Sequence, residues 1–103
     1  MTKTSFKDII NSEKPVIVDF YADWCGPCKA QTPILEQLKK ELGEEARIVK
    51  IDVDKNPALA EKLQVMSIPT IMIFQNGEQK WRAMGVQSFG ILKEQVRKLA
   101  PAS

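Results

Sequence analysis

Residues 16–29 read Val-Ile-Val-Asp-Phe-Tyr-Ala-Asp-Trp-Cys-Gly-Pro-Cys-Lys and hold both cysteines of the chain, Cys25 and Cys28. The first seven of these residues form an apolar run interrupted only by Asp19, which is typical of a strand inside a sheet that helices cover on both faces. A helix is predicted from Cys25 or the next residue to Leu42, because apolar residues recur there at helical spacing. Its expected apolar side consists of Ala30, Ile34, Leu35, Leu38 and Leu42. The cysteines therefore lie at a junction of strand and helix.

Two thiols three positions apart can cycle between dithiol and disulfide, contribute to a metal site, or form a static crosslink. A zinc or iron–sulfur site takes about four thiolate or imidazole ligands. The chain has 2 cysteines and no histidine, so only a site shared between two chains would supply enough ligands. A static crosslink contributes little when the loop that it closes is this short. Redox chemistry is therefore the leading interpretation.

Cys25 occupies the predicted start of the helix. Unpaired backbone N–H groups and the positive end of the helix dipole favour an anion there, so we expect its thiolate to be stabilised. Cys28 follows one turn later and is placed to attack the Cys25 sulfur from within the helix.

The hexapeptide Trp24-Cys25-Gly26-Pro27-Cys28-Lys29 resembles the active-site signature of the thioredoxin family, which stands here unaltered. A bare Cys-x-x-Cys is a weak signal, whereas this hexapeptide after a hydrophobic strand is a strong one. The resemblance implies that Cys25 is the nucleophile and that Cys28 resolves the mixed disulfide. It also implies that Gly26 and Pro27 set the redox potential.

Asp19 is an acid in an otherwise apolar strand, where a carboxylate must find a partner or take up a proton. It either caps a local group or has a raised pKa and moves a proton to or from the Cys28 thiol through water. The thioredoxin family carries a buried acid at this position relative to its first cysteine, which favours proton transfer. The family pattern also brings Lys50 close enough to neutralise Asp19 in part. The alternative is a lysine that extends to the sheet edge.

A second functional stretch, Val65-Met66-Ser67-Ile68-Pro69-Thr70, resembles the family's loop with a cis proline that packs against the dithiol. We expect Pro69 to be cis, although a simple turn is the alternative. The Ile68 backbone would then pair with an extended substrate. Gly85 matches a family glycine that leaves room for the substrate, or it simply ends a strand. The expected apolar patch around an exposed Cys25 comprises Trp24, Gly26, Pro27, Ile68, Pro69, Gly85 and Val86, with Trp24, Ile68, Pro69, Gly85 and Val86 binding substrate.

The remaining patterns predict an α/β fold. Three further helices are expected: one over Ser5–Asn11 capped by Thr4 or Ser5, one starting at Asn56-Pro57 with Asn56 as its cap, and a last one capped by Ser88. Strands are expected over 47–53, 70–74 and 79–84, and the last two are joined by a hairpin at Asn76-Gly77. The resemblance covers nearly the whole chain from Phe6 onward and implies the thioredoxin fold. That fold is a three-layer α/β/α sandwich with a central mixed sheet of about four strands and four helices, here in a single domain over residues 1–103. A further strand at the amino end is expected to be vestigial or absent, because only Met1-Thr2-Lys3 precede the first helix.

Composition and charge argue against several other classes of protein. The formal net charge of +2 comes without a basic cluster, so nucleic-acid binding is not expected. No apolar run approaches the length that crosses a bilayer, so no membrane association is expected. Residues 1–12 lack the pattern of a signal peptide, and we expect a cytoplasmic protein and, by default, a monomer. In that compartment a lone cysteine pair is more often catalytic than structural.

The resemblance also implies the partners. It predicts a general reductase of disulfides in protein substrates that is itself recharged by thioredoxin reductase, a flavoprotein that uses NADPH. No cofactor is expected to be bound in this chain. One alternative is a disulfide oxidant or isomerase, whose relatives carry a different pair between the cysteines, often with histidine. The other is a docking subunit that uses the fold without turnover.

Overall fold

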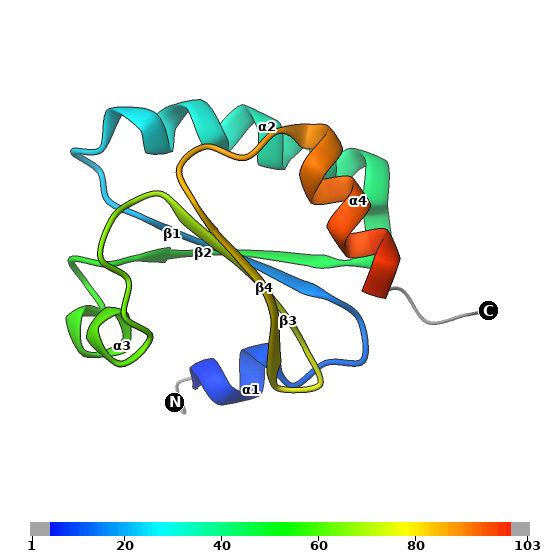
Figure 1. Ribbon diagram of the computed structural model, residues 1–103, viewed down its shortest axis with the longest axis horizontal. Coiled ribbons are helices and arrows are strands. Elements are labelled where there is room, and N and C mark those ends of the chain that lie inside the picture. The colour runs from blue at the N-terminus through cyan, green and yellow to red at the C-terminus, as the bar shows by residue number, and fades with distance from the viewer. Residues whose placement is uncertain (1–4, 100–103) are drawn as a thin grey trace, which may run out of the picture.

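Residues 5–99 are described in the computed structural model, and they form a four-stranded mixed sheet with helices on both faces (Figure 1). The elements in chain order are α1 (Phe6–Ile10), β1 (Val16–Tyr21), α2 (Gly26–Leu42), a 3-10 turn (Gly43–Glu45), β2 (Arg47–Asp52), α3 (Pro57–Lys62), β3 (Thr70–Gln75), β4 (Glu78–Met84) and α4 (Phe89–Leu99). The strand order is β2-β1-β3-β4. Strands β1 and β2 are parallel, and the other two neighbouring pairs are antiparallel. This confirms the predicted fold class. The expectation that a first strand ahead of α1 is vestigial or absent concerns residues 1–3, which lie outside the described residues.

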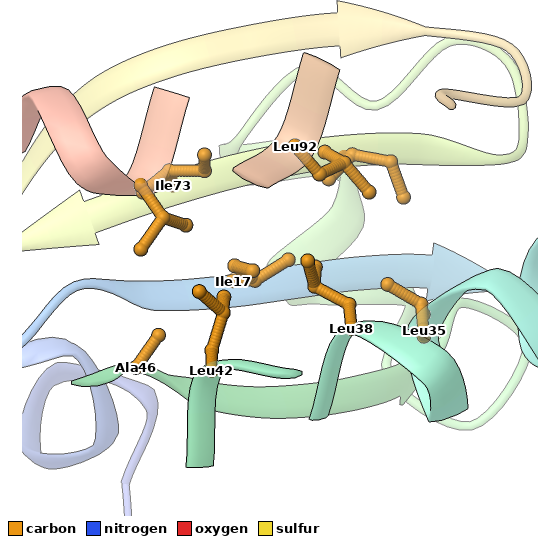
Figure 2. Close-up of a cluster of buried hydrophobic side chains, with 9 residues drawn as sticks. Ile17, Leu35, Leu38, Leu42, Ala46, Ile73 and Leu92 are labelled. Carbon is orange, nitrogen blue, oxygen red and sulfur yellow. The ribbon is translucent and has the colours of Figure 1, made fainter. Parts of the chain in front are cut away.

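Strand β1 is buried on both faces, which explains its nearly continuous apolar sequence. Alternate side chains of a strand point to opposite faces. Ile17 packs with α2 and α4, and Figure 2 shows it beside Leu38 and Leu42 of α2. Val16, Val18 and Phe20 pack instead in the cluster that includes Ile10 at the end of α1. Because Asp19 shares the face of Ile17, its carboxyl group lies on the α2 side of the sheet.

Helix α2 begins and ends where the sequence predicts. Cys25 is its N-cap with an extended backbone, and Gly43 ends it with a φ of 53°, a left-handed conformation that favours glycine. The expectation that Ala30 lies on the apolar side was wrong, because Ala30 is exposed. The buried stripe instead consists of Cys28, Gln31, Leu35, Leu38 and Leu42. Steps of three and four residues put position 31 on the core side and position 30 in solvent.

The shorter elements are fixed by local hydrogen bonds. Ser5 caps α1 by accepting a bond from the backbone N–H of Asp8 at 3.2 Å, as predicted. The side chain of Ser88 accepts a bond from the N–H of Ile91 at 3.2 Å, which confirms the predicted cap of α4. Asn56 is the N-cap residue of α3, as predicted, but its side chain makes no capping hydrogen bond. Its side-chain amide donates instead to the carbonyl of Asp52 at 3.0 Å, which pairs the last carbonyl of β2.

Candidate redox site

Cys25 and Cys28 are joined by a disulfide at the amino end of α2, with their Cα atoms 5.3 Å apart. The Cys25 sulfur accepts a hydrogen bond from the backbone N–H of Cys28 at 3.1 Å. An N-cap group normally accepts this bond, and the helix dipole adds a positive potential at the same place. The position therefore stabilises a thiolate on Cys25 once the disulfide is reduced.

Both cysteines are buried, each only 3% exposed, so the expectation of an exposed Cys25 was wrong for this oxidised state. Ala22 is buried with the cysteines, and Ile68 packs against this cluster. The Cys25 sulfur lies 3.7 Å from the carbonyl oxygen of Ile68. The next peptide bond, Ile68-Pro69, is cis, as predicted. The segment before β3 is thus folded against the disulfide and restricts access to its sulfur atoms.

Trp24 forms an exposed wall beside the disulfide, with 71% of its surface accessible. Its indole N–H donates to the Asp54 carboxylate at 2.8 Å. A hollow of about 290 Å³ opens between this indole and the loop before β3. Its lining residues are Trp24, Val53, Val65, Met66, Ser67 and Ile68. Asp54 was not predicted as a site residue, because 30 residues separate it from Trp24 and it belongs to no motif.

Asp19 is fully buried, and neither of its carboxylate oxygens has a hydrogen-bond partner among the described residues. Burial raises the pKa of Asp19 to about 6, against the opposing effect of the nearby Lys50 charge. Desolvation is the larger effect, because no hydrogen bond compensates the loss of water. A local capping role is therefore excluded in this structure, and the carboxyl can exchange a proton near neutral pH.

Lys50 lies beside Asp19 in the sheet, where the two residues are paired between β1 and β2. Its ammonium group does not form an ion pair with Asp19. It donates to the hydroxyl of Thr32 at 2.9 Å and lies 4.6 Å from the centre of the Tyr21 ring. Lys50 is exposed, as the alternative interpretation expected, and its charge still lowers the pKa of Asp19. Sequence reasoning missed Thr32, although it follows Cys28 by one helical turn.

A small hollow of about 120 Å³ lies next to Cys28 of the disulfide. Thr32 and Lys50 are also among its lining residues. A hollow of this size with polar groups on its wall has room for water.

The loop after β4 completes the site. Gly85 has a φ of 86°, which favours glycine, and its N–H donates to the carbonyl of Pro69 at 2.8 Å. Val86 is 42% exposed next to it. Met66 and Met84 are more exposed still, at 87% and 66%, and sequence reasoning did not include them. The structure thus brings apolar side chains from three separate segments to the end of the molecule that holds the disulfide.

Within residues 5–99, no group of three or more potential ligands among histidine, cysteine, aspartate and glutamate is placed to hold a metal ion. Within the same residues, no helix has the length and apolar character needed to cross a bilayer.

Comparison with known proteins agrees with this geometry. The thioredoxin family model matches residues 1–98. Thioredoxin of Rickettsia felis is 43% identical over 99 residues, which cover 95% of this chain and 94% of that protein. This chain belongs to the thioredoxin family. The bifunctional thioredoxin reductase/thioredoxin of Mycobacterium leprae is 42% identical over 96 residues, which cover 93% of this chain and 21% of that protein. A mutant thioredoxin from Halobacterium salinarum superimposes with a TM-score of 0.86 at 36% identity, covering 99% of this chain and 88% of that one.

Family membership and the redox-active pair together define the activity. The protein is a thiol–disulfide oxidoreductase, and within the thioredoxin family it is a protein-disulfide reductase. Its disulfide occupies the family's active-site position at the start of α2.

Proposed function

We propose that this protein is a general reductant of disulfides in other proteins and that Cys25 is its nucleophile. The Cys25 thiolate attacks one sulfur of a substrate disulfide, forms a mixed disulfide and releases the other substrate sulfur as a thiolate. The observation that carries this assignment is the Cys25 sulfur at the N-cap of α2, where it accepts the N–H of Cys28 at 3.1 Å. Among the described residues, the sulfur of Cys28, one turn inside the helix, has no comparable donor.

Cys28 then resolves the mixed disulfide. Its thiolate attacks the Cys25 sulfur, forms the intramolecular disulfide and releases the second substrate sulfur as a thiolate. The substrate gains two electrons, and the Cys25–Cys28 pair loses them. Asp19 accepts the proton that the Cys28 thiol must lose, and water in the hollow beside Cys28 carries it. The Asp19 pKa of about 6 suits a group that must change protonation near neutral pH.

Three other residues tune the pair in this proposal. The positive charge of Lys50 lowers the pKa of Asp19 and so limits the rise that burial causes. Gly26 and Pro27, between the cysteines, set the redox potential. Pro27 restricts the backbone in the first turn of α2 without removing a helical hydrogen bond.

The docking surface for protein substrates comprises the residues around the disulfide. An extended substrate segment pairs with the backbone of Ile68, beside the cis bond to Pro69. Gly85 leaves room for this segment, while Trp24 and Val86 supply apolar contacts on either side. The exposure of Trp24 and Val86 next to a buried disulfide supports this assignment.

The oxidised protein is recharged by thioredoxin reductase with electrons from NADPH, and no cofactor is bound in this chain. The relative from Mycobacterium leprae, named as a bifunctional thioredoxin reductase/thioredoxin, supports such a pairing. We further propose that the protein acts in the cytoplasm as a monomer, without nucleic-acid or membrane partners, and that residues 1–103 form one domain.

Trapping tests the roles of the two cysteines. Reduced Cys28→Ser should form a stable mixed disulfide with insulin or another protein disulfide, because no thiol remains to release the substrate. Cys25→Ser should form none under the same conditions, since Cys28 lies inside the helix and lacks the N-cap position that stabilises a thiolate on Cys25. Non-reducing electrophoresis and intact mass measure the adduct. An adduct on Cys25→Ser in place of Cys28→Ser would reverse the two assignments.

The reduction potential tests the direction of electron flow. A value near the roughly −270 mV of thioredoxin, measured by equilibration with a dithiol and Trp24 fluorescence, supports a reductant. A value of about −180 to −120 mV would indicate an isomerase or oxidant, a difference of roughly 4 to 7 kcal/mol. A docking subunit would instead keep its biological role after both cysteines are changed to serine.

A further inference from the structure

Gln31 is a fully buried glutamine within the apolar stripe of α2. It follows Cys28 by three residues, so the two side chains share one face of the helix. A primary amide carries two donors and an acceptor, and burying it is unfavourable unless these groups are paired. Its partners therefore indicate why a polar residue is tolerated among Leu35, Leu38 and Leu42.

Both ends of the Gln31 amide pair with the backbone of one residue, Gln87. The side-chain N–H donates to the Gln87 carbonyl at 3.0 Å. The side-chain oxygen accepts the Gln87 N–H at 2.7 Å. This two-point contact resembles the pairing of residues in neighbouring strands, and it fixes both the position and the orientation of the Gln87 backbone relative to α2. In Figure 1 the segment between β4 and α4 passes next to α2, where these bonds form.

Gln87 ends the loop Gly85–Gln87, which is also fastened at its start. The N–H of Gly85 donates to the carbonyl of Pro69 at 2.8 Å. The Gln87 side chain donates to the carbonyls of Met84 and Gly85, each at 3.1 Å. One end of the loop is thus tied to the cis-proline segment and the other to the helix that carries both cysteines. Val86, between these ties, is the loop residue with its side chain exposed at 42%.

We propose that Gln31 is a positioning residue that holds the Gly85–Gln87 loop in register with the disulfide, so that protein substrates can dock on the loop while Cys25 reacts. The proposal rests on the proposed function, which assigns Gly85 and Val86 to substrate docking. Among the described residues, the side-chain hydrogen bonds of Gln31 go to Gln87 and not to either sulfur, so Gln31 leaves the chemistry of the pair unchanged. An apolar side chain of similar length fills the same space but cannot pair with the Gln87 backbone, and the loop loses its tie to α2. A small disulfide, which does not need the loop, reacts as before.

The test compares two disulfides of different size. Second-order rate constants are measured for the reduced wild-type protein and for Gln31→Met, with insulin as the protein disulfide and dithiodipyridine as the small one. Gln31→Leu provides a second apolar variant if the methionine variant does not fold. The matched control is Gln37→Met, which makes the same change at an exposed position of the same helix. The reduction potential of each variant and hydrogen exchange at the Gln87 amide are measured alongside.

The expected result is at least about a fivefold lower rate constant with insulin for Gln31→Met, in line with the loss of one to two neutral hydrogen bonds. Its rate constant with dithiodipyridine and its reduction potential should match those of the wild type, its Gln87 amide should exchange faster, and Gln37→Met should behave as wild type. The positioning role would be overturned if Gln31→Met lost the same factor in rate constant with both disulfides, if its reduction potential shifted, or if its rate constants did not change. A wild-type protein that reduces dithiodipyridine but not insulin would overturn the proposed function itself, and the docking role with it.

Discussion

Asp19 lowers the stability of the fold, although the proposed mechanism requires it. Its carboxyl group is buried without a hydrogen-bond partner among the described residues, and its pKa is raised from 3.8 to about 6. The folded protein therefore binds a proton more tightly than the unfolded chain does between these two values. The free energy of unfolding therefore falls as pH rises from about 4 to about 6, because the buried carboxyl group loses its proton. Above that range the full cost of burying the charge is present.

Replacing Asp19 with asparagine should raise the free energy of unfolding of the oxidised protein by about 3 kcal/mol at pH 7.5, because a shift of about two pKa units corresponds to that difference. The gain over the wild type should shrink toward zero below about pH 3, where Asp19 is protonated in both folded and unfolded states. Urea denaturation at several pH values measures it. Release of substrate from the mixed disulfide should become slower in the same variant, since Cys28 loses its proton acceptor.

Asp23→Asn provides the control for this experiment, because Asp23 is exposed two residues before Cys25. It should change the free energy of unfolding by no more than about 0.5 kcal/mol at any pH. A gain for Asp19→Asn that is the same at pH 4 and pH 7.5 would contradict the assignment of the effect to the Asp19 charge.

The hairpin between β3 and β4 depends on backbone conformations that few residues adopt. Asn76 and Gly77 have φ values of 53° and 81°, two successive left-handed residues as in a type I′ turn. Their N–H groups donate to the carbonyls of Ser12 and Ile10 at 2.7 and 3.0 Å. The turn thus fastens the end of α1 to the sheet as well as joining two strands.

Two glycine-to-alanine substitutions should therefore have opposite effects. Gly77→Ala should lower the free energy of unfolding by about 1 to 2 kcal/mol, because an L-residue is strained at this φ although no atom blocks its Cβ. Gly90→Ala should raise it by about 0.5 to 1 kcal/mol, because Gly90 is an exposed residue in α4 with space for a Cβ. Thermal and urea denaturation measure both. A gain for Gly77→Ala would show that the turn changes its conformation at little cost.

At the scale of the whole molecule, two hydrophobic clusters lie on opposite faces of one sheet. Ile17 and Leu38 belong to the cluster under α2 and α4, whereas Val18 and Phe20 belong to the cluster on the face of α1. Strand β1 contributes to both, so loss of one cluster exposes the strand that supports the other. Glu41 adds an exposed link between the two helices of the first face, with ion pairs to Lys93 at 3.0 Å and to Arg97 at 3.7 Å. The hydrogen bond from Lys93, and then the charges of Lys93 and Arg97, lower the pKa of Glu41, but exposed pairs contribute little to stability.

Leu38→Ala tests whether the proposed single domain unfolds as one unit. Leu38 is fully buried, and its truncation should cost about 2 to 5 kcal/mol of the free energy of unfolding. Far-UV circular dichroism and the fluorescence of the two tryptophans, Trp24 and Trp81, should shift to the same lower urea midpoint, because both clusters depend on β1. The control Ile91→Ala, at a position 44% exposed in α4, should cost less than about 1 kcal/mol. Separate midpoints for the two probes would contradict one cooperative domain.

Local sequence patterns predicted most of the secondary-structure elements and the place of the two cysteines at the start of α2. The N-cap position of Cys25, the stop at Gly43 and the turn at Asn76-Gly77 follow from backbone chemistry within a few residues, which is why local patterns predicted them. The cis bond before Pro69 was also predicted, although only through the resemblance to a known family.

The contacts between residues far apart in the sequence depend on tertiary packing. The bond from Trp24 to Asp54 joins residues 30 apart, and the bonds from Gln31 to Gln87 join residues 56 apart. The near-complete burial of Cys25 and the turn of Lys50 toward Thr32 likewise depend on how α2, β2 and the loop before β3 pack together. No local pattern encodes such contacts, because a polar side chain takes whichever partner the packed elements leave within reach.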